Sequence, residues 1–391
     1  MDTANTTLPD MPASHTLDSD FPVNPHTDVI VIGAGPAGIA TAIAANQKGL
    51  RTIIFDARTP PIDKPCGEGL LPQGVAALRS LGIHLDSNIA VPFAGIRFAG
   101  GESSAYAKFP DAPGFALRRV RLHQLLVELA NQAGVIFHWG TRVTNIDSTH
   151  VKTRNMRIPY TWLVGADGQN SIVRRWTKIG PMRTSGKRFG FRQHFRVRSW
   201  PNLVDVHWGQ HCQMLVTPTE AQEVCVSVLS RDAGLRISQA LPLFPELVER
   251  LRDATPTTRE LGNATSLNRL PAVSRGRVAL VGDASGSVDA ITGHGLSLAF
   301  QQAIFLAEAF ERGDLAHYES AHRKIAVMPG LMSRLMLIMD RNSWVRRKTL
   351  RLFENKPGVF SKLLSIHADA LPLSSLSVGE MIDFGWELLR I

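Results

Sequence analysis

A glycine-rich turn, Gly33-Ala34-Gly35-Pro36-Ala37-Gly38, stands between a short apolar run and an alanine-rich segment. Glycines at this spacing permit a tight turn and let the backbone approach a pyrophosphate, which then lies at the N-terminus of the following helix. Asp56 follows about 20 residues later, where an acidic side chain would hold the hydroxyls of a ribose. The pattern predicts a dinucleotide site, and taken alone it fits both FAD and NAD.

A second motif lies in Arg277–Gly295, which reads RVALVGDASGSVDAITGHG. Asp283 closes a buried strand, where a carboxylate is costly unless it accepts hydrogen bonds, for example from a ribityl hydroxyl and backbone N–H groups. Gly293 and Gly295 open a helix whose N-terminus can face the pyrophosphate and the N1–C2=O edge of a flavin. The motif favours FAD over NAD, the alternative being an Asp that caps a core helix.

A third motif, Gly165-Ala166-Asp167-Gly168, ends an apolar run and precedes Ser171 and Arg174 in the first turn of an expected helix. Alone, it would be an ordinary turn with a capping Asp. Because it lies between the other two motifs, we interpret it as part of the same cofactor site.

The segments between the motifs predict the elements that position them. Short apolar runs, typical of buried parallel strands, cover residues 28–32, 51–56, 135–139 and 277–283. Helical patterns cover 39–48 and 120–132, and everything from 314 onward looks helical. Alternation of apolar and polar residues in 189–229 predicts antiparallel strands. We therefore expect an α/β fold with a discontinuous Rossmann-type FAD-binding domain, an inserted antiparallel-sheet substrate domain and a C-terminal helical region.

The expected domain boundaries follow from these elements. They are a disordered leader at 1–26, the first part of the FAD-binding domain at 27–180, a sheet-rich substrate domain at 181–270, the second part of the FAD-binding domain at 271–315 and a helical region at 316–391. The leader lacks the basic and apolar stretches of a signal peptide.

The composition indicates in which cellular environment the protein works. Three cysteines (Cys66, Cys212 and Cys225) form neither a disulfide framework nor a metal-ligand pattern, so we predict no metal and a reducing cytoplasm. No uninterrupted apolar stretch reaches the roughly 18 residues of a membrane span. The net charge of +9 is not evenly spread: residues 321–353 hold eight Lys or Arg residues against one acidic residue, Asp340.

In this order and at these separations, the three motifs resemble those of the FAD-dependent group A monooxygenase superfamily, which includes the geranylgeranyl reductases. The resemblance covers roughly residues 28–310. It implies that the glycine-rich turn binds the ADP part, that Asp167-Gly168 lies near the pyrophosphate and that Asp283 binds the ribityl chain. Arg119, with Leu122 and Leu126, fits the family pattern Arg-x-x-Leu-x-x-x-Leu and is implied to bind the cofactor; otherwise it is a solvated residue at the start of a helix.

The run Pro65-Cys66-Gly67-Glu68-Gly69-Leu70 is similar to geranylgeranyl reductases, in which it lies beside the isoalloxazine ring. Gly286 and Ala290 stand where many aromatic hydroxylases carry His and Pro, which argues against a simple phenol hydroxylase. His207-Trp208-Gly209, Val216-Thr217-Pro218 and the basic C-terminus resemble oxidoreductases found beside type III polyketide synthases.

The resemblance implies a hydroxylase driven by NADPH or NADH. Reduced FAD would react with O2 to form a C4a-hydroperoxide, whose distal oxygen is attacked by a small hydrophobic, aromatic or polyketide-derived lipid-like substrate. Since no second glycine-rich motif exists, NAD(P)H would bind only transiently. The alternative is a reductase of isoprenoid double bonds. A halogenase ranks lower because the Trp-x-Trp-x-Ile-Pro segment of halogenases is absent, and a non-catalytic flavin-binding protein is disfavoured by the intact motifs.

His294 and Cys66 are the candidate catalytic residues. His294 could donate a proton beside the flavin, or it could simply be a tolerated polar residue. Cys66 could take part in reduction, or it could be a small packed residue. The full predicted cofactor set is Gly33, Gly35, Ala37, Gly38, Asp56, Arg58, Cys66, Gly67, Arg119, Val143, Asp167, Asp283, Gly293, His294, Gly295 and Leu296.

Basic and apolar residues are interleaved in the C-terminal helical region, which includes Arg334, Leu335, Ile338, Arg341 and Lys348. A basic amphipathic helix is typical of a membrane-surface element, so peripheral membrane contact through residues 328–353 is one prediction. The other is a helix packed on the core with a solvated basic face. No motif supports a nucleic-acid partner.

Overall fold

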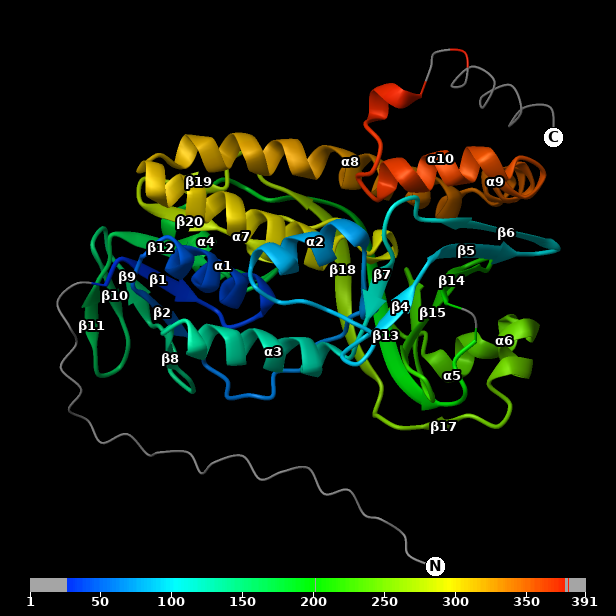
Figure 1. Cartoon of the computed structure of the whole chain (residues 1–391), viewed down its shortest axis with the longest axis horizontal. Helices are drawn as coiled ribbons and strands as arrows, with labels where there is room; N and C mark the ends of the chain where they lie inside the picture. Colours follow the sequence, from blue (N-terminus) through cyan, green and yellow to red (C-terminus); the bar gives the residue numbers. More distant parts are fainter. Residues whose placement is uncertain (1–26, 201, 377–378, 380–391) are drawn as a thin grey trace, which may run out of the picture.

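The computed structural model describes residues 27–200, 202–376 and 379. The predicted leader, residues 1–26, lies outside the described residues. A parallel sheet with its helices forms one side of the molecule and a large, mostly antiparallel sheet forms the other, as Figure 1 shows. This arrangement confirms the predicted fold class.

The described helices are α1 (Pro36–Gln47), α2 (Pro72–Ser80), α3 (Arg119–Gln132), α4 (Ile172–Thr177), α5 (Ile237–Ala240), α6 (Pro245–Arg250), α7 (Gly295–Arg312), α8 (Leu315–Arg341), α9 (Ser343–Asn355) and α10 (Pro357–His367). The central sheet consists of β19 (Ser274–Arg275), β20 (Val278–Leu280), β12 (Trp162–Gly165), β1 (Val29–Ile32), β2 (Thr52–Phe55) and β8 (Ile136–His138), in that order. Its strands are parallel except for β19.

The two faces of the central sheet are covered differently. Along β1, Val29 and Val31 face the core formed with α1, α3 and α7, whereas Ile30 and Ile32 pack on the opposite side. That second side is covered by a small sheet of β9 (Asn145–Ile146), β10 (His150–Lys152) and β11 (Arg157–Pro159). Burial on both faces explains why β1 is a continuous apolar run.

The large sheet contains β17 (Thr255–Pro256), β13 (Arg183–Arg196), β16 (Glu223–Ser230), β15 (Cys212–Glu220), β14 (Leu203–Trp208), β5 (Gly95–Gly100) and β6 (Ser103–Lys108), with β18 (Leu261–Arg269) also paired to β13. The hairpin β5–β6 joins it through parallel pairing of β5 with β14. A second small sheet is formed by β3 (Gly69–Leu70), β7 (Gly114–Ala116) and β4 (Val91–Phe93). The residues that build the large sheet therefore come from both halves of the chain.

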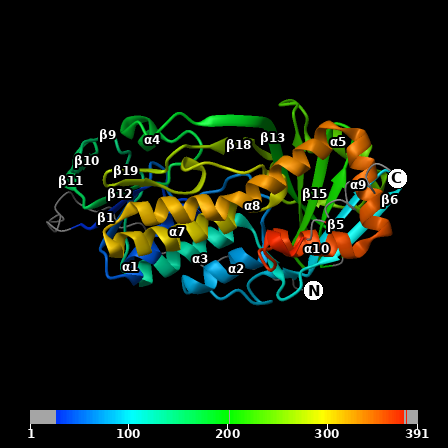
Figure 2. The same cartoon turned by 90° about the horizontal axis from the view of Figure 1, so that it is seen from above.

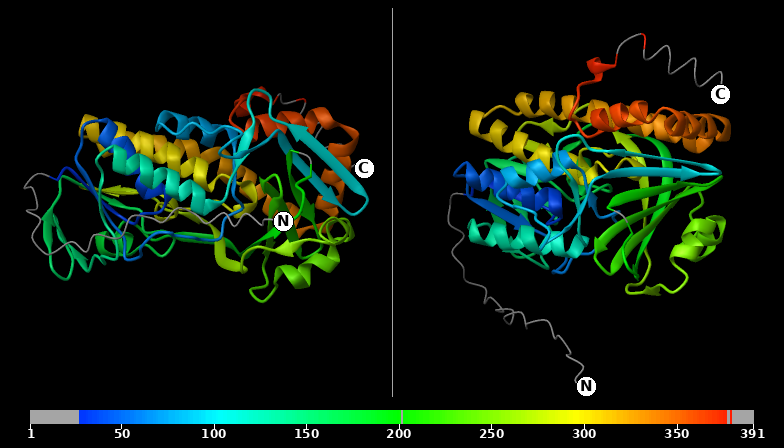
Figure 3. Two further views of the ribbon diagram at one scale, coloured as in Figure 1. Left: turned by 60° about the horizontal axis from the view of Figure 1, so that its bottom comes forward. Right: turned by 45° about the vertical axis from the view of Figure 1, so that its right-hand side comes forward.

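The C-terminal helices bridge the two sides. Seen from above, α8 lies along α7 and extends toward α9 and α10 (Figure 2). Figure 3 shows α9 and α10 across the hairpin β5–β6. There the rings of Phe353 and Phe360 stack on each other, and the ring of Phe98 packs against both at a tilt. Asn342 separates α8 from α9, and its side chain caps α9 by accepting hydrogen bonds from the N–H groups of Trp344 and Val345. No helix within the described ranges is long and apolar enough to cross a membrane.

Candidate functional site

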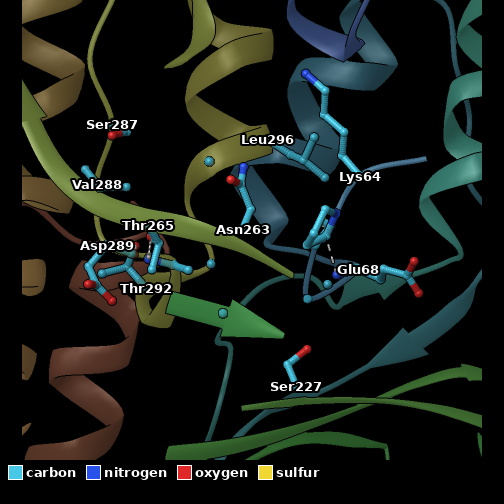
Figure 4. A pocket seen from close by; sticks show the side chains of 18 of the residues that line it. Lys64, Glu68, Ser227, Asn263, Thr265, Ser287, Val288, Asp289, Thr292 and Leu296 are labelled. Atoms are coloured by element: carbon cyan, nitrogen blue, oxygen red, sulfur yellow. Dashed lines mark hydrogen bonds between the residues drawn. The ribbon is translucent and has the colours of Figure 1, made fainter. Parts of the chain in front are cut away.

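A cavity of about 320 Å³ lies where the loops of the central sheet meet the large sheet. Its walls include all three motifs. In Figure 4, Lys64 and Glu68 lie on one side of this cavity and Asp289 and Thr292 on the other, with Leu296 between them. Polar groups from loops far apart in the sequence therefore converge on one space.

The glycine-rich turn is shaped by close backbone contacts. Gly33 has φ +109°, and a Cβ there would lie 2.4 Å from the carbonyl oxygen of Ala166. A Cβ on Gly38 would lie 1.9 Å from the oxygen of Gly33. Only glycine fits at these two positions, because backbone atoms cannot move aside as a flexible side chain can.

Three further glycines leave room for a ligand. Gly35, Gly67 and Gly295 line the cavity, and a Cβ on each would enter open space. Gly35 also precedes the N-terminus of α1, which begins with Pro36, and Gly295 begins α7. Two helix N-termini with their unpaired N–H groups thus face the cavity, as binding of an anionic dinucleotide requires.

The charges in the cavity favour an anion. Lys64 and Arg119 both line it. Burial, and then the charges of Arg58 and Arg119, lower the pKa of Lys64. Asp283 also lines the cavity. Burial raises the pKa of its carboxyl group, although the positive charges of Lys64 and Arg119 act in the opposite direction. Because Lys64 lies near the positive charges of Arg58 and Arg119, an anionic group such as a pyrophosphate between Lys64 and Arg119 would relieve their repulsion.

Two of the predicted carboxylates hold backbone atoms. Asp56 accepts hydrogen bonds from the N–H groups of Ala34 (2.8 Å) and Arg58 (2.8 Å), which fixes it beside the glycine-rich turn. Asp167 accepts hydrogen bonds from the N–H groups of Ile172 (2.7 Å) and Val173 (3.2 Å), so it caps the start of α4. Gly168, and not Asp167, lines the cavity.

The other predicted residues divide into two groups. Ala37, Cys66, Gly67, Gly293, Gly295 and Leu296 line the cavity. Arg58 lies outside its lining and is exposed, and Val143 is buried in the core behind the central sheet. The structure therefore brings the loop Cys66-Gly67 and the start of α7 together, while Val143 has no side-chain contact with this space.

His294 points away from the cavity. Its ring is buried beside His367 of α10, with Nδ1 3.1 Å from the oxygen of Thr292 and Nε2 3.0 Å from the oxygen of His367. Burial lowers the pKa of His294 to about 4, although both carbonyl oxygens favour the charged ring. This placement favours a role in joining α7 to α10.

The floor of the cavity is the inner face of the large sheet, which sequence analysis did not identify residue by residue. Arg192 and Ser227 are register partners on β13 and β16, and Leu215 lies opposite Ser227 on β15. Because the side chains of directly paired residues point to the same side of a sheet, these three side chains share one face. The apolar side chains of the cavity wall include Phe93, Ile96, Val204, Val206, Leu215 and Leu229, and its polar side chains from the large sheet include Arg192, Thr217 and Ser227.

This combination of a parallel sheet, a glycine cradle with cationic neighbours and an adjacent apolar floor defines a flavoprotein oxidoreductase. The family model described as the FAD binding domain matches residues 26–313, and the chain belongs to this family. It is an FAD-dependent oxidoreductase, and the resemblance to the group A monooxygenase superfamily with its geranylgeranyl reductases is confirmed.

Curated relatives include both reductases and monooxygenases. The menaquinone reductase of Mycobacterium tuberculosis is 27% identical over 334 residues, covering 75% of this chain and 79% of the relative. The kynurenine 3-monooxygenase of Xanthomonas campestris pv. campestris is 27% identical over 349 residues, covering 75% of each chain. Among solved structures, a geranylgeranyl bacteriochlorophyll reductase-like protein from Thermoplasma acidophilum has a TM-score of 0.66 at 18% identity and covers 91% of this chain and 95% of its own.

Proposed function

We propose that FAD extends along the cavity from the glycine-rich turn to the cavity floor. The ADP part would lie at Gly33–Gly38 beside Asp56, and Lys64 and Arg119 would neutralise the pyrophosphate. Asp283 would accept hydrogen bonds from the ribityl hydroxyls. The ring system would lie between the Cys66-Gly67 loop and the N-terminus of α7, whose positive end would stabilise negative charge on the N1–C2=O edge. The bound flavin supplies the redox chemistry.

The proposed reaction is NAD(P)H-driven hydroxylation of an aromatic or polyketide-derived, lipid-like substrate by O2. The observation that carries it is the apolar floor next to the cofactor cradle. Ile96, Val204, Val206 and Leu215 offer a surface for a ring with an alkyl chain. Val206 is buried and the other three are partly buried, so a chain bound on them would displace water from this surface. Association with a type III polyketide synthase would supply such a substrate.

A flavin-dependent reductase of isoprenoid double bonds is the second candidate. The Cys66-Gly67 loop, whose sequence resembles that of geranylgeranyl reductases, lines the cavity, and the relatives include a menaquinone reductase. The same apolar floor would accommodate an isoprenoid chain. The thiol of Cys66 is half-buried and accepts a hydrogen bond from the N–H of Glu68 at 3.4 Å.

The consumption of O2 distinguishes hydroxylation from double-bond reduction. Purified holoenzyme is mixed with NADH or NADPH and either a long-chain alkylresorcinol or a menaquinone, with and without O2. Hydroxylation predicts oxygen uptake that depends on the resorcinol and no product under anaerobic conditions. Anaerobic saturation of a double bond would instead establish the reductase.

We also propose that α8 and α9 contact an anionic membrane surface. Their exposed apolar residues include Val327, Leu335, Ile338 and Trp344. Arg334, Ile338 and Arg341 lie on one face of α8, because they are four and then three positions apart. Among the basic residues of these two helices, Arg346 is buried and donates to the carbonyl oxygen of Met339, so it adds no surface charge.

A further inference from the structure

The floor of the cavity changes from polar to apolar along one row of paired residues. From β13 across β16 and β15 to β14, the members of this row are Arg192, Ser227, Leu215 and Val206. All four line the cavity, and directly paired side chains point to the same side of a sheet. A ligand lying along the row would therefore meet a hydroxyl group at β16 and apolar side chains at β15 and β14.

The hydroxyl group of Ser227 faces the cavity and has almost no protein partner. Ser227 is only 8% exposed, and in Figure 4 its oxygen points from the strand up into the cavity. Within residues 27–200 and 202–376, the one group that bonds to this oxygen is the thiol of Cys225, at 3.8 Å. A thiol bonds weakly, so a ligand that displaces water from the floor must supply a partner for the Ser227 hydroxyl or lose a hydrogen bond.

The charged side chains next to Ser227 are engaged by other groups. The guanidinium group of Arg192 donates to Asp63, and its Nη1 lies 3.3 Å from Nδ1 of His194. Nε2 of His194 lies 2.5 Å from Oε2 of Glu68. Because these contacts direct both side chains of β13 toward other acceptors, neither of them occupies the Ser227 hydroxyl.

Ser227 also lies beside the loop that would hold the flavin ring. Cys225 is two positions before Ser227 on β16, so the two side chains face the same side of the sheet. Sγ of Cys225 lies 3.8 Å from the carbonyl oxygen of Cys66, which places the Cys66-Gly67 loop over this part of the floor. The polar part of the row is therefore next to the proposed position of the ring system, and Val206 lies two strands, or about 10 Å, further along the sheet.

We propose that the Ser227 hydroxyl binds a hydroxyl group on the ring of the substrate and thereby orients an amphiphile on the floor. The ring of the substrate lies over β16 next to the Cys66-Gly67 loop, and its alkyl chain lies on Leu215 and Val206. This inference rests on the proposed function and deepens it, since it specifies which end of the substrate meets the cofactor. It favours oxidation of a hydroxylated ring over saturation of a double bond in the chain, because the chain is held away from the loop.

A single hydrogen bond is enough to select this direction. Apolar contact is non-directional, so Leu215 and Val206 alone would accept an alkyl chain in either direction. A hydrogen bond acts over a short distance and at a preferred angle. A substrate bound in reverse would bury its own hydroxyl and that of Ser227 without partners, which costs more than the hydrogen bond contributes.

The test compares the binding of two probes to the oxidised holoenzyme, followed by the change in flavin absorbance. The probes are undecylresorcinol and its dimethyl ether, which has the same ring and chain but no hydroxyl group. Wild-type protein should bind the resorcinol more tightly than the ether. In Ser227→Ala this preference should fall about three- to tenfold, the contribution of one hydrogen bond, while the affinity for the ether stays within about twofold. Ser227→Thr, which keeps a hydroxyl, should retain the preference.

Ser230→Ala is the matched control, because it removes a hydroxyl from the same strand. Ser230 is three positions from Ser227 and so faces the other side of the sheet, where its Oγ donates to the carbonyl oxygen of His211 at 3.2 Å. This variant should keep the wild-type preference. If Ser227→Ala does not retain FAD, Ser227→Cys takes its place, because a thiol has nearly the same size and bonds weakly.

An unchanged preference in the variants that lack the Ser227 hydroxyl would overturn the inference. An equal loss of preference in Ser230→Ala would also overturn it, since the effect would then not depend on the face of the sheet. Failure of the wild-type protein to bind either probe is a different result, which would refute the proposed aromatic, lipid-like substrate itself.

Discussion

Lys64 is expected to be a main electrostatic contact of the cofactor. It lines the cavity near Arg119 and Asp283, and a charged hydrogen bond to a phosphate contributes about 1.5–3 kcal/mol. Lys64→Met should therefore raise the Kd for FAD by about ten- to hundredfold. The measurement is flavin fluorescence during titration of the apoprotein. Lys48→Met is the control, because Lys48 pairs with Glu311 far from the cavity; equal affinities in the two variants would contradict the assignment.

For the individual residues of the site, the sequence predicted the backbone conformation better than the positions of the side chains. The requirement for glycine at positions 33 and 38 is local, because the strand–turn–helix pattern imposes it. Lys64 carried no such signal, since its role depends on Arg119 and Asp283, which are distant in the chain. The orientation of His294 was also invisible: its position before α7 suggested the flavin, but its ring packs on His367.

His294 and His367 join the N-terminus of α7 to α10, and their burial makes this contact sensitive to acid. Burial lowers the pKa of His294 from 6.5 to about 4. The unfolded chain therefore binds the proton more readily than the folded chain between these values, so the free energy of unfolding falls as pH drops from 6.5 toward 4.

His294→Asn should reduce the acid-induced loss in the free energy of unfolding by at most about 3 kcal/mol. Urea unfolding of the holoenzyme at pH 7.5 and pH 5, with excess FAD, measures the difference. His84→Asn, at an exposed histidine, serves as the reference. An identical loss of stability on acidification in wild type and His294→Asn would show that this ring is not responsible.

The elements themselves were largely predictable, because both helices of the cofactor region and four strands of the central sheet have strong local patterns. The predicted helix 120–132 corresponds to α3, and the predicted strand 28–32 corresponds to β1. Pairing of β5 with β14 was not predictable, since it joins residues about a hundred positions apart and depends on the hydrophobic face of the completed sheet. The contact of His194 with Glu68 was hidden for the same reason.

The whole molecule is expected to bind anionic membranes in a salt-sensitive manner. The protein should sediment with phosphatidylglycerol vesicles at low salt and be released as salt rises, because basic residues near a charged bilayer contribute about 1 kcal/mol each. Arg334→Glu with Arg341→Glu should abolish sedimentation. Arg79→Glu with Arg154→Glu makes the same charge change at exposed sites elsewhere. Equal binding by both double variants, or no binding by the wild type, would contradict the proposal.

The origin of the atoms in the product distinguishes hydroxylation from reduction. Holoenzyme, NAD(P)H and a long-chain alkylresorcinol are incubated under isotopically heavy oxygen gas, and the product is examined by mass spectrometry. We expect a product that has gained one heavy oxygen atom, because a hydroxylase inserts one atom of O2 into its substrate. A product that has gained two hydrogens and no heavy oxygen, from this or an isoprenoid substrate, would contradict hydroxylation.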